Sequence, residues 1–174
     1  MTLSKASVIN DEKDSIILFT SLLLRHPELS TLTYYPRENN LKLTFILNSN
    51  LGETPFQQFN QDLITSIGAY LYFNKREIPR EITASFDYEA GLGKITITRD
   101  ALTLGQKEIS LIINLLYLHF PQLLLHGKKA DFGEEDFPLD DDYLKQTLGN
   151  LQPHSFKNKI MALREDGRIL IYKQ

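Results

Sequence analysis

The hydrophobic positions along the chain follow two spacings, one typical of helices and one typical of strands. Helical spacing occurs in three segments, which begin near residues 11, 54 and 106. Alternating, strand-like positions occur at 32–35 and 41–47, at 81–88 and 94–98, and again at 159–164 and 168–173. The order is therefore αββ, αββ, α, an insert, and ββ. This order predicts an α+β fold in which an antiparallel sheet carries its helices mainly on one face.

Capping residues and prolines predict where the helices begin and end. Pro27 disfavours a helical conformation at the residue before it and should end the first helix. The third helix is expected to extend from 106 to about 120. The predicted N-terminal signals are Asn10 or Asp11 for the first helix, Thr54 followed by Pro55 for the second, and Thr103 with Gln106 for the third.

The recurrence of the αββ unit predicts that one domain arose by duplication or triplication of this unit. Two helix ends are similar in sequence, Leu-Arg-His-Pro-Glu-Leu at 24–29 and Leu-His-Phe-Pro-Gln-Leu at 118–123. The alternative is that proline and leucine recur there because they are common at the ends of unrelated helices. The 174 residues suit one domain. We expect an αββαββα core at 1–126, an acidic insert with a short helix at 127–155, and a C-terminal β-hairpin at 156–174 that belongs to the same domain.

The third predicted helix is apolar on most of its surface. Its polar residues form a narrow stripe of Lys107, Ser110, Asn114 and Tyr117. A helix of this kind has to be covered on two sides. The cover is expected to come from the C-terminal segment or from a second subunit, so the sequence predicts a homo-oligomer or a protein partner bound through this helix.

Composition narrows the classes of function. The chain has 19 Lys and Arg against 22 Asp and Glu, a net charge of −3, which gives no overall basic field for nucleic acid or an anionic membrane. Because it has no cysteine, it has no disulfide and no thiolate chemistry. The polar N-terminus lacks a signal-peptide pattern, and the apolar stretch 109–125 is interrupted by polar residues. We therefore predict a cytoplasmic protein without a membrane partner.

The stretch 126–155, which contains the acidic insert, carries most of the first candidate site. The simpler interpretation is a solvated loop followed by a short helix beginning at Leu139 or Asp140. The alternative is a divalent metal site, with no other cofactor predicted. Two histidines seven residues apart across a proline do not share a helix face, and the acids do not match a calcium loop, so the spacing argues against the metal. The candidate ligands are His119, His126, Asp131, Glu134 and Glu135.

Basic residues around the C-terminal hairpin carry the second candidate site, for nucleic acid. Phe156 and Tyr172 lie among them and could stack on bases. The alternative is that these charges protect strand edges from pairing, and Glu165 and Asp166 weaken the local field. The candidate residues are Lys157, Lys159, Arg164, Arg168 and Lys173.

No catalytic motif is recognisable, and Gly91-Leu92-Gly93-Lys94 is expected to be a hairpin turn rather than a phosphate loop. Some of the aromatic residues near the first two hairpins must be core, and an exposed subset would be a binding surface. These aromatic residues are Tyr34, Tyr35, Tyr70, Tyr72, Phe73 and Tyr88. We therefore predict a non-enzymatic protein-interaction or regulatory module that self-associates. The alternatives are a metal-dependent enzyme that uses the insert and a nucleic-acid-binding module that uses the hairpin.

Overall fold

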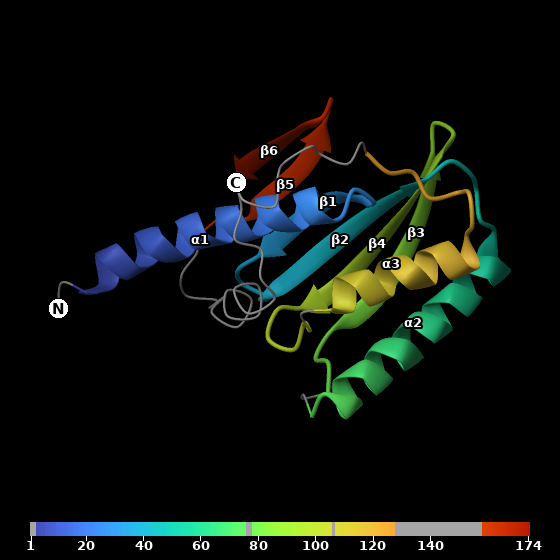
Figure 1. Ribbon diagram of the computed structural model, residues 1–174, viewed down its shortest axis with the longest axis horizontal. Helices are drawn as coiled ribbons and strands as arrows, with labels where there is room; N and C mark the ends of the chain where they lie inside the picture. Colours follow the sequence, from blue (N-terminus) through green and yellow to red (C-terminus); the bar gives the residue numbers. More distant parts are fainter. Residues whose placement is uncertain (1–2, 76–77, 106, 128–157) are drawn as a thin grey trace.

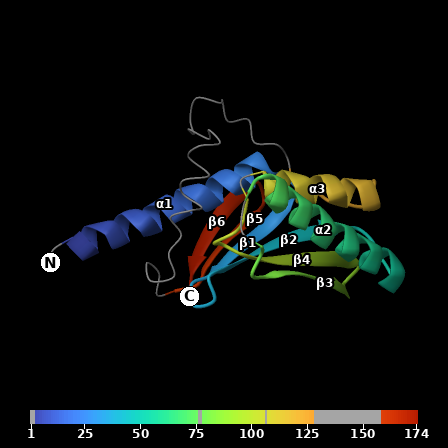
Figure 2. The same ribbon diagram turned by 90° about the horizontal axis from the view of Figure 1, so that it is seen from below.

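A computed structural model describes residues 3–75, 78–105, 107–127 and 158–174, with only the backbone described at 3–12 and 14. These residues form three helices and one antiparallel sheet of six strands, an α+β fold (Figure 1). The helices lie over one face of the sheet (Figure 2), which confirms the predicted architecture. The elements are α1 (Leu3–Arg25), β1 (Leu29–Tyr35), β2 (Asn40–Leu47), α2 (Glu53–Phe73), β3 (Ile82–Glu89), β4 (Leu92–Asp100), α3 (Glu108–His119), β5 (Ile160–Glu165) and β6 (Arg168–Lys173).

The strands are arranged in the order β3-β4-β2-β1-β5-β6. β2 pairs with β4, with Leu43 opposite Ile97, and β1 pairs with β5, with Leu32 opposite Ala162. These four side chains are fully buried. Because side chains alternate between the faces of a strand, every second residue of β2 enters the core under the helices, whereas a register shift between Leu29 and Thr31 interrupts this alternation in β1.

Two of the hairpins have two-residue turns with positive φ angles. Ala90 and Gly91 have φ angles of 53° and 81°, and Asp166 and Gly167 have 47° and 75°. Two successive positive φ angles match the twist of antiparallel strands, and such turns favour Gly and Asp. The hairpins predicted at 81–98 and 159–173 are therefore confirmed, although the turn of the first is Ala90-Gly91, and Leu92, Gly93 and Lys94 belong to β4.

The ends of two helices differ from the prediction. α1 begins at Leu3, so Asn10 and Asp11 lie inside the helix. No Gly or Pro interrupts the residues before them, so a helical backbone can continue through this segment. α2 begins at Glu53 after Gly52, which places Thr54 inside the first turn rather than at the cap. The C-terminus of α1 at Arg25 agrees with the stop expected at Pro27.

The start of α3 also differs. The helix begins at Glu108 after Lys107, and Thr103 does not cap it. Instead the hydroxyl of Thr103 donates a hydrogen bond of 2.6 Å to Asp100, which holds it in the preceding connection. A side chain engaged in a local turn cannot also satisfy the first amides of a helix.

The apolar surface of α3 is covered by the sheet and by α2. Ile109, Ile112 and Leu116 belong to the core, and Phe59 of α2 packs against Phe120 with 5.4 Å between the ring centroids. The predicted polar stripe along 107–117 is exposed. Because α2 covers the second side of α3, the apolar surface of this helix no longer requires a partner. A dimer through α3 stays a prediction.

The predicted acidic insert and its short helix lie outside the described residues, apart from residue 127. The internal repeat and the division into segments stay predictions. None of the helices that the structure describes is both long and apolar enough to cross a membrane.

Candidate protein-interaction surface

A buried arginine at the end of β4 organises one end of the molecule. The Arg99 side chain is completely buried, and each of its N–H groups has an acceptor. Nε and Nη2 bind the two carboxylate oxygens of Glu108, at 2.6 and 3.0 Å. The remaining N–H groups donate to the backbone oxygen of Glu81, at 2.8 Å, and to the side chains of Asp100 and Thr103. A paired guanidinium of this kind is a fixed junction in the core.

Asp100 joins this junction to two connections of the chain. One carboxylate oxygen accepts hydrogen bonds from the backbone amides of Arg80 and Glu81, at 3.0 and 3.1 Å. The other accepts from the amide and the hydroxyl of Thr103, at 2.9 and 2.6 Å. Burial acts to raise the pKa of Asp100, but these bonds and the charge of Arg99 together hold it below its ordinary value. Asp100 is therefore ionised and fixes the approach to β3 and the departure from β4.

The start of α3 is held by the same junction. Glu108 accepts a hydrogen bond of 3.2 Å from the amide of Gly105 in addition to those from Arg99. Gly105 lies against the ring of Tyr70 on α2, so closely that a Cβ atom there would be 2.4 Å from the ring. The hydroxyl of Tyr70 in turn accepts a hydrogen bond from the amide of Lys107. Gly105 and Lys107 are thereby fixed against the C-terminal part of α2.

Large apolar side chains are exposed where these segments meet. Ile78, Phe73 and Tyr72 have exposed fractions of 86%, 79% and 77%, the highest among the large apolar residues described, and Leu102 has 53%. The rings of Tyr72 and Phe73 are in contact, with 5.6 Å between centroids. Figure 1 shows the end of α2, the chain just before β3 and the chain just after β4 on the same side of the molecule. We call these four residues the exposed apolar end.

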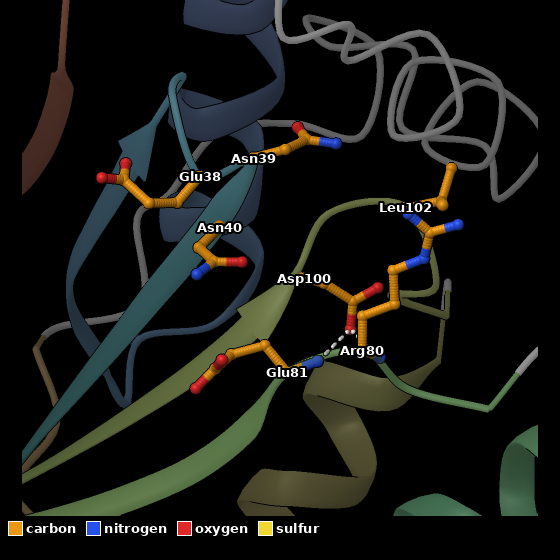
Figure 3. A pocket seen from close by; sticks show the side chains of 7 residues that line it. All are labelled: Glu38, Asn39, Asn40, Arg80, Glu81, Asp100 and Leu102. Atoms are coloured by element: carbon orange, nitrogen blue, oxygen red, sulfur yellow. Dashed lines mark hydrogen bonds between the residues drawn. The ribbon is translucent and has the colours of Figure 1, made fainter.

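Basic side chains surround the exposed apolar end. Lys75, Arg80 and Lys107 are exposed and form no ion pair within the described part of the chain. Arg80 and Leu102 also line a polar cavity of about 210 Å³, together with Asp100 (Figure 3). The surface thus combines aromatic side chains with an arginine, residue types that are enriched in interfaces, and adds two lysines at its border.

A second cavity, of about 340 Å³, lies between the end of α1 and α3. His26 and Glu28 line it from one side, and Ser110 and Asn114 from the other. Burial lowers the pKa of His26 to about 4, and the charge of Arg25 adds to this effect while that of Glu28 opposes it. The imidazole is therefore neutral at physiological pH.

The predicted metal ligands include two described residues. Nε2 of His119 lies 2.8 Å from a carboxylate oxygen of Asp62 on α2, and Nδ1 of His126 lies 3.3 Å from the backbone oxygen of Gly127. Among the described residues no group of three or more His, Asp or Glu side chains could hold a metal ion. Asp131, Glu134 and Glu135 lie outside them, so the metal site stays a prediction that elemental analysis of purified protein would test.

The predicted nucleic-acid residues are divided between the two faces of the sheet. Arg164 is opposite Ile169 and Lys173 is opposite Ile160, which places both on the helix side, and the Arg164 guanidinium donates to the backbone oxygen of Leu23 in α1. Alternation places Lys159 and Arg168 on the open face. Lys157 lies outside the described residues. The sequence placed these charges close together along the chain, but the two-residue period of a strand separates them.

The junction at Arg99 was not recognised from the sequence, although a signal was present. Ile95, Ile97 and Arg99 are alternate residues of β4 and therefore lie on the same face of the strand, and the first two are apolar. The alternation therefore directs Arg99 into the core, where a guanidinium needs carboxylate partners.

The comparisons with known proteins give no relative. No protein-family model matches the chain, and no curated protein and no solved structure matches it. The arrangement of side chains is thus the sole basis for a proposal about function.

Proposed function

We propose that the protein is a non-enzymatic protein-interaction module and that the exposed apolar end is its docking surface. The observation that carries this proposal is the high exposure of four apolar side chains on segments that meet at one end of the molecule, with the rings of Tyr72 and Phe73 in contact; the four are Tyr72, Phe73, Ile78 and Leu102. Monomeric proteins rarely expose large contiguous apolar patches unless a partner covers them. Aromatic side chains of this kind commonly carry most of the binding energy in interfaces.

The charges around the patch indicate the chemistry of the partner. Lys75, Arg80 and Lys107 give a positive border to an apolar centre. Complementary partners carry acidic residues beside aromatic or leucine anchors, because opposite potentials speed association and select the partner. We therefore propose an acidic, amphipathic peptide segment of another protein as the ligand.

A selection from a random peptide library would test this proposal. The wild-type protein is expected to enrich sequences with acidic residues flanking an aromatic residue or leucine. A synthetic peptide from this selection should bind the Tyr72→Ser/Phe73→Ser variant at least about tenfold more weakly, because two anchors are lost. Fluorescence anisotropy of the labelled peptide measures the dissociation constant.

Tyr88→Ser/Leu92→Ser is the matched control, because Tyr88 and Leu92 are exposed by 48% and 45% at the β3–β4 hairpin, away from the patch. This control should bind as the wild type does. Equal binding by the Tyr72→Ser/Phe73→Ser variant, or enrichment of basic peptides, would contradict the proposal.

A second candidate function, binding of single-stranded nucleic acid, is favoured by one observation on the open face of the sheet. The ammonium groups of Lys42 and Lys159 lie 4.8 and 5.1 Å from the centre of the Tyr35 ring. Aromatic rings beside cations are the usual elements of such sites.

This candidate predicts salt-sensitive binding of a labelled oligonucleotide, lost in Lys42→Glu/Lys159→Glu. Lys173→Glu, on the helix side, should keep the binding. Absence of binding by the wild type at low salt would exclude this function.

A further inference from the structure

The outer edge of β6 is the feature with the clearest unused bonding capacity. β6 is the last strand of the sheet and pairs with β5 through a two-residue turn, with Glu165 opposite Arg168. In this register every second residue of β6 forms hydrogen bonds with β5, beginning with Arg168. The amide of Gln174, which continues this series, donates a hydrogen bond of 2.8 Å to the backbone oxygen of Lys159. The N–H and C=O groups of Ile169 and Ile171 therefore point away from β5. Within the described part of the chain, no strand pairs with them.

This edge is apolar, unlike the opposite edge of the sheet. β6 has the sequence Arg-Ile-Leu-Ile-Tyr-Lys, in which Ile169, Leu170 and Ile171 are only half-buried. β3, at the other edge, exposes Thr83, Ser85 and Asp87 between its apolar residues. Free apolar edges pair readily with other strands, so natural proteins usually protect or cover them.

We propose that a second copy of the chain covers this edge, by antiparallel pairing of β6 with β6 about a two-fold axis at Leu170. Each Leu170 then lies opposite the partner's Leu170 on the open face. Ile169 exchanges hydrogen bonds with the partner's Ile171, which uses the backbone groups that point outward. Arg168 faces the partner's Tyr172, a favourable contact between a guanidinium and an aromatic ring.

The contact between Arg168 and Tyr172 favours this register over the neighbouring one. With the axis at Leu170, each Arg168 faces the partner's Tyr172. With the axis at Ile171, Arg168 would instead lie opposite the partner's Gln174, and Tyr172 opposite the partner's Leu170, so this contact is lost. A two-fold contact of this kind is closed, so it gives a dimer rather than a fibre. The two sheets join into one, with all helices on the same side.

The dimer does not depend on the proposed docking function. β6 and β3 are opposite edges of the sheet, and α2, which carries Tyr72 and Phe73, packs on β3. Both docking surfaces therefore remain accessible in the dimer, which would give the assembly two copies of the site and the gain in avidity that follows from them.

A single engineered cysteine tests the register, because the natural chain has no cysteine. In oxidised Leu170→Cys, the two thiols face each other across the axis and should form an intermolecular disulfide, seen as a dimer on non-reducing gels. Leu163→Cys is the matched control, since Leu163 is the neighbour of Leu170 on β5, one strand further from the axis. Leu163→Cys should stay uncrosslinked. Absence of a crosslink at position 170, or equal crosslinking at both positions, would overturn the proposal.

Sedimentation velocity tests the association without a covalent bond. The wild type should sediment as a dimer that dissociates on dilution. Leu170→Lys places two ammonium groups face to face and should raise the dimer dissociation constant at least about tenfold, whereas Leu163→Lys should leave it unchanged. Circular dichroism checks that both variants are folded. A wild-type chain that is monomeric at all concentrations would refute the dimer.

Discussion

The Arg99→Met variant is expected to lose about 3–5 kcal/mol of unfolding free energy at neutral pH, as found when one member of a buried ion pair is removed. Arg99 is fully buried, and so is Glu108, its bidentate partner. Without the guanidinium, the Glu108 carboxylate keeps only the amide of Gly105 as a donor among the hydrogen bonds described. Since a domain is stable by about 5–15 kcal/mol, the loss should be obvious in urea denaturation followed by circular dichroism.

The Arg99→Met/Glu108→Leu double variant is the control. Removing both charges leaves no unpaired carboxylate at position 108, while Asp100 keeps the amides of Arg80 and Glu81 and both donors of Thr103. The double variant should therefore be more stable than Arg99→Met alone, a non-additive result that identifies a buried pair. A single variant within about 1 kcal/mol of the wild type, or a double variant that is less stable than Arg99→Met, would contradict the role given to Arg99.

A second large effect is expected from His26 when the pH is lowered. Its pKa is 6.5 in the unfolded chain and about 4 in the folded protein, because burial disfavours the charged imidazole. The unfolded chain therefore binds a proton first. Above pH 6.5 the imidazole is neutral in both states and does not lower the free energy of unfolding. As the pH falls from 6.5 toward 4, protonation of the unfolded chain lowers the free energy of unfolding by up to about 3 kcal/mol.

The test compares the free energy of unfolding of the wild type and His26→Gln between pH 6.5 and 4. The variant should show a flatter profile, whereas His126→Gln, which changes an exposed histidine, should follow the wild type. An NMR titration of the imidazole gives the pKa directly. A midpoint near 6.5 for His26 in the folded protein would show that this side chain is not desolvated.

The parts of the fold that depend on local patterns could be predicted from the sequence. Leu41, Leu43, Phe45 and Leu47 alternate in β2 and are all buried, and the hairpin turn at Asp166 has the geometry that its sequence favours. Helix starts were less accurate, because Thr103 can cap a helix or bond within a turn, and the choice depends on a carboxylate at Asp100.

The candidate site could be predicted only in part. An exposed subset of the aromatic residues was expected, and the structure selects Tyr72 and Phe73, while Tyr34 is buried and bonds to Asn39. This selection depends on how α2 ends against the 101–107 connection. The basic residues of the hairpin are adjacent in sequence, yet a strand directs Arg164 and Lys159 to opposite faces, so proximity along the chain was a poor guide to a shared surface.

The pairing of β1 with β5 joins segments from distant parts of the chain, and this has a consequence for folding. The two N-terminal hairpins and their helices bring together β3, β4, β2 and β1 from the first part of the chain, through mostly shorter loops. Such contacts form early, while distant pairings wait for a long loop to close. Until β5 arrives, β1 is itself an edge with unpaired amides beside Leu32 and Tyr34. During folding we therefore expect an aggregation-prone intermediate in which β1 is exposed as an edge, and the β5–β6 hairpin removes this edge when it pairs with β1.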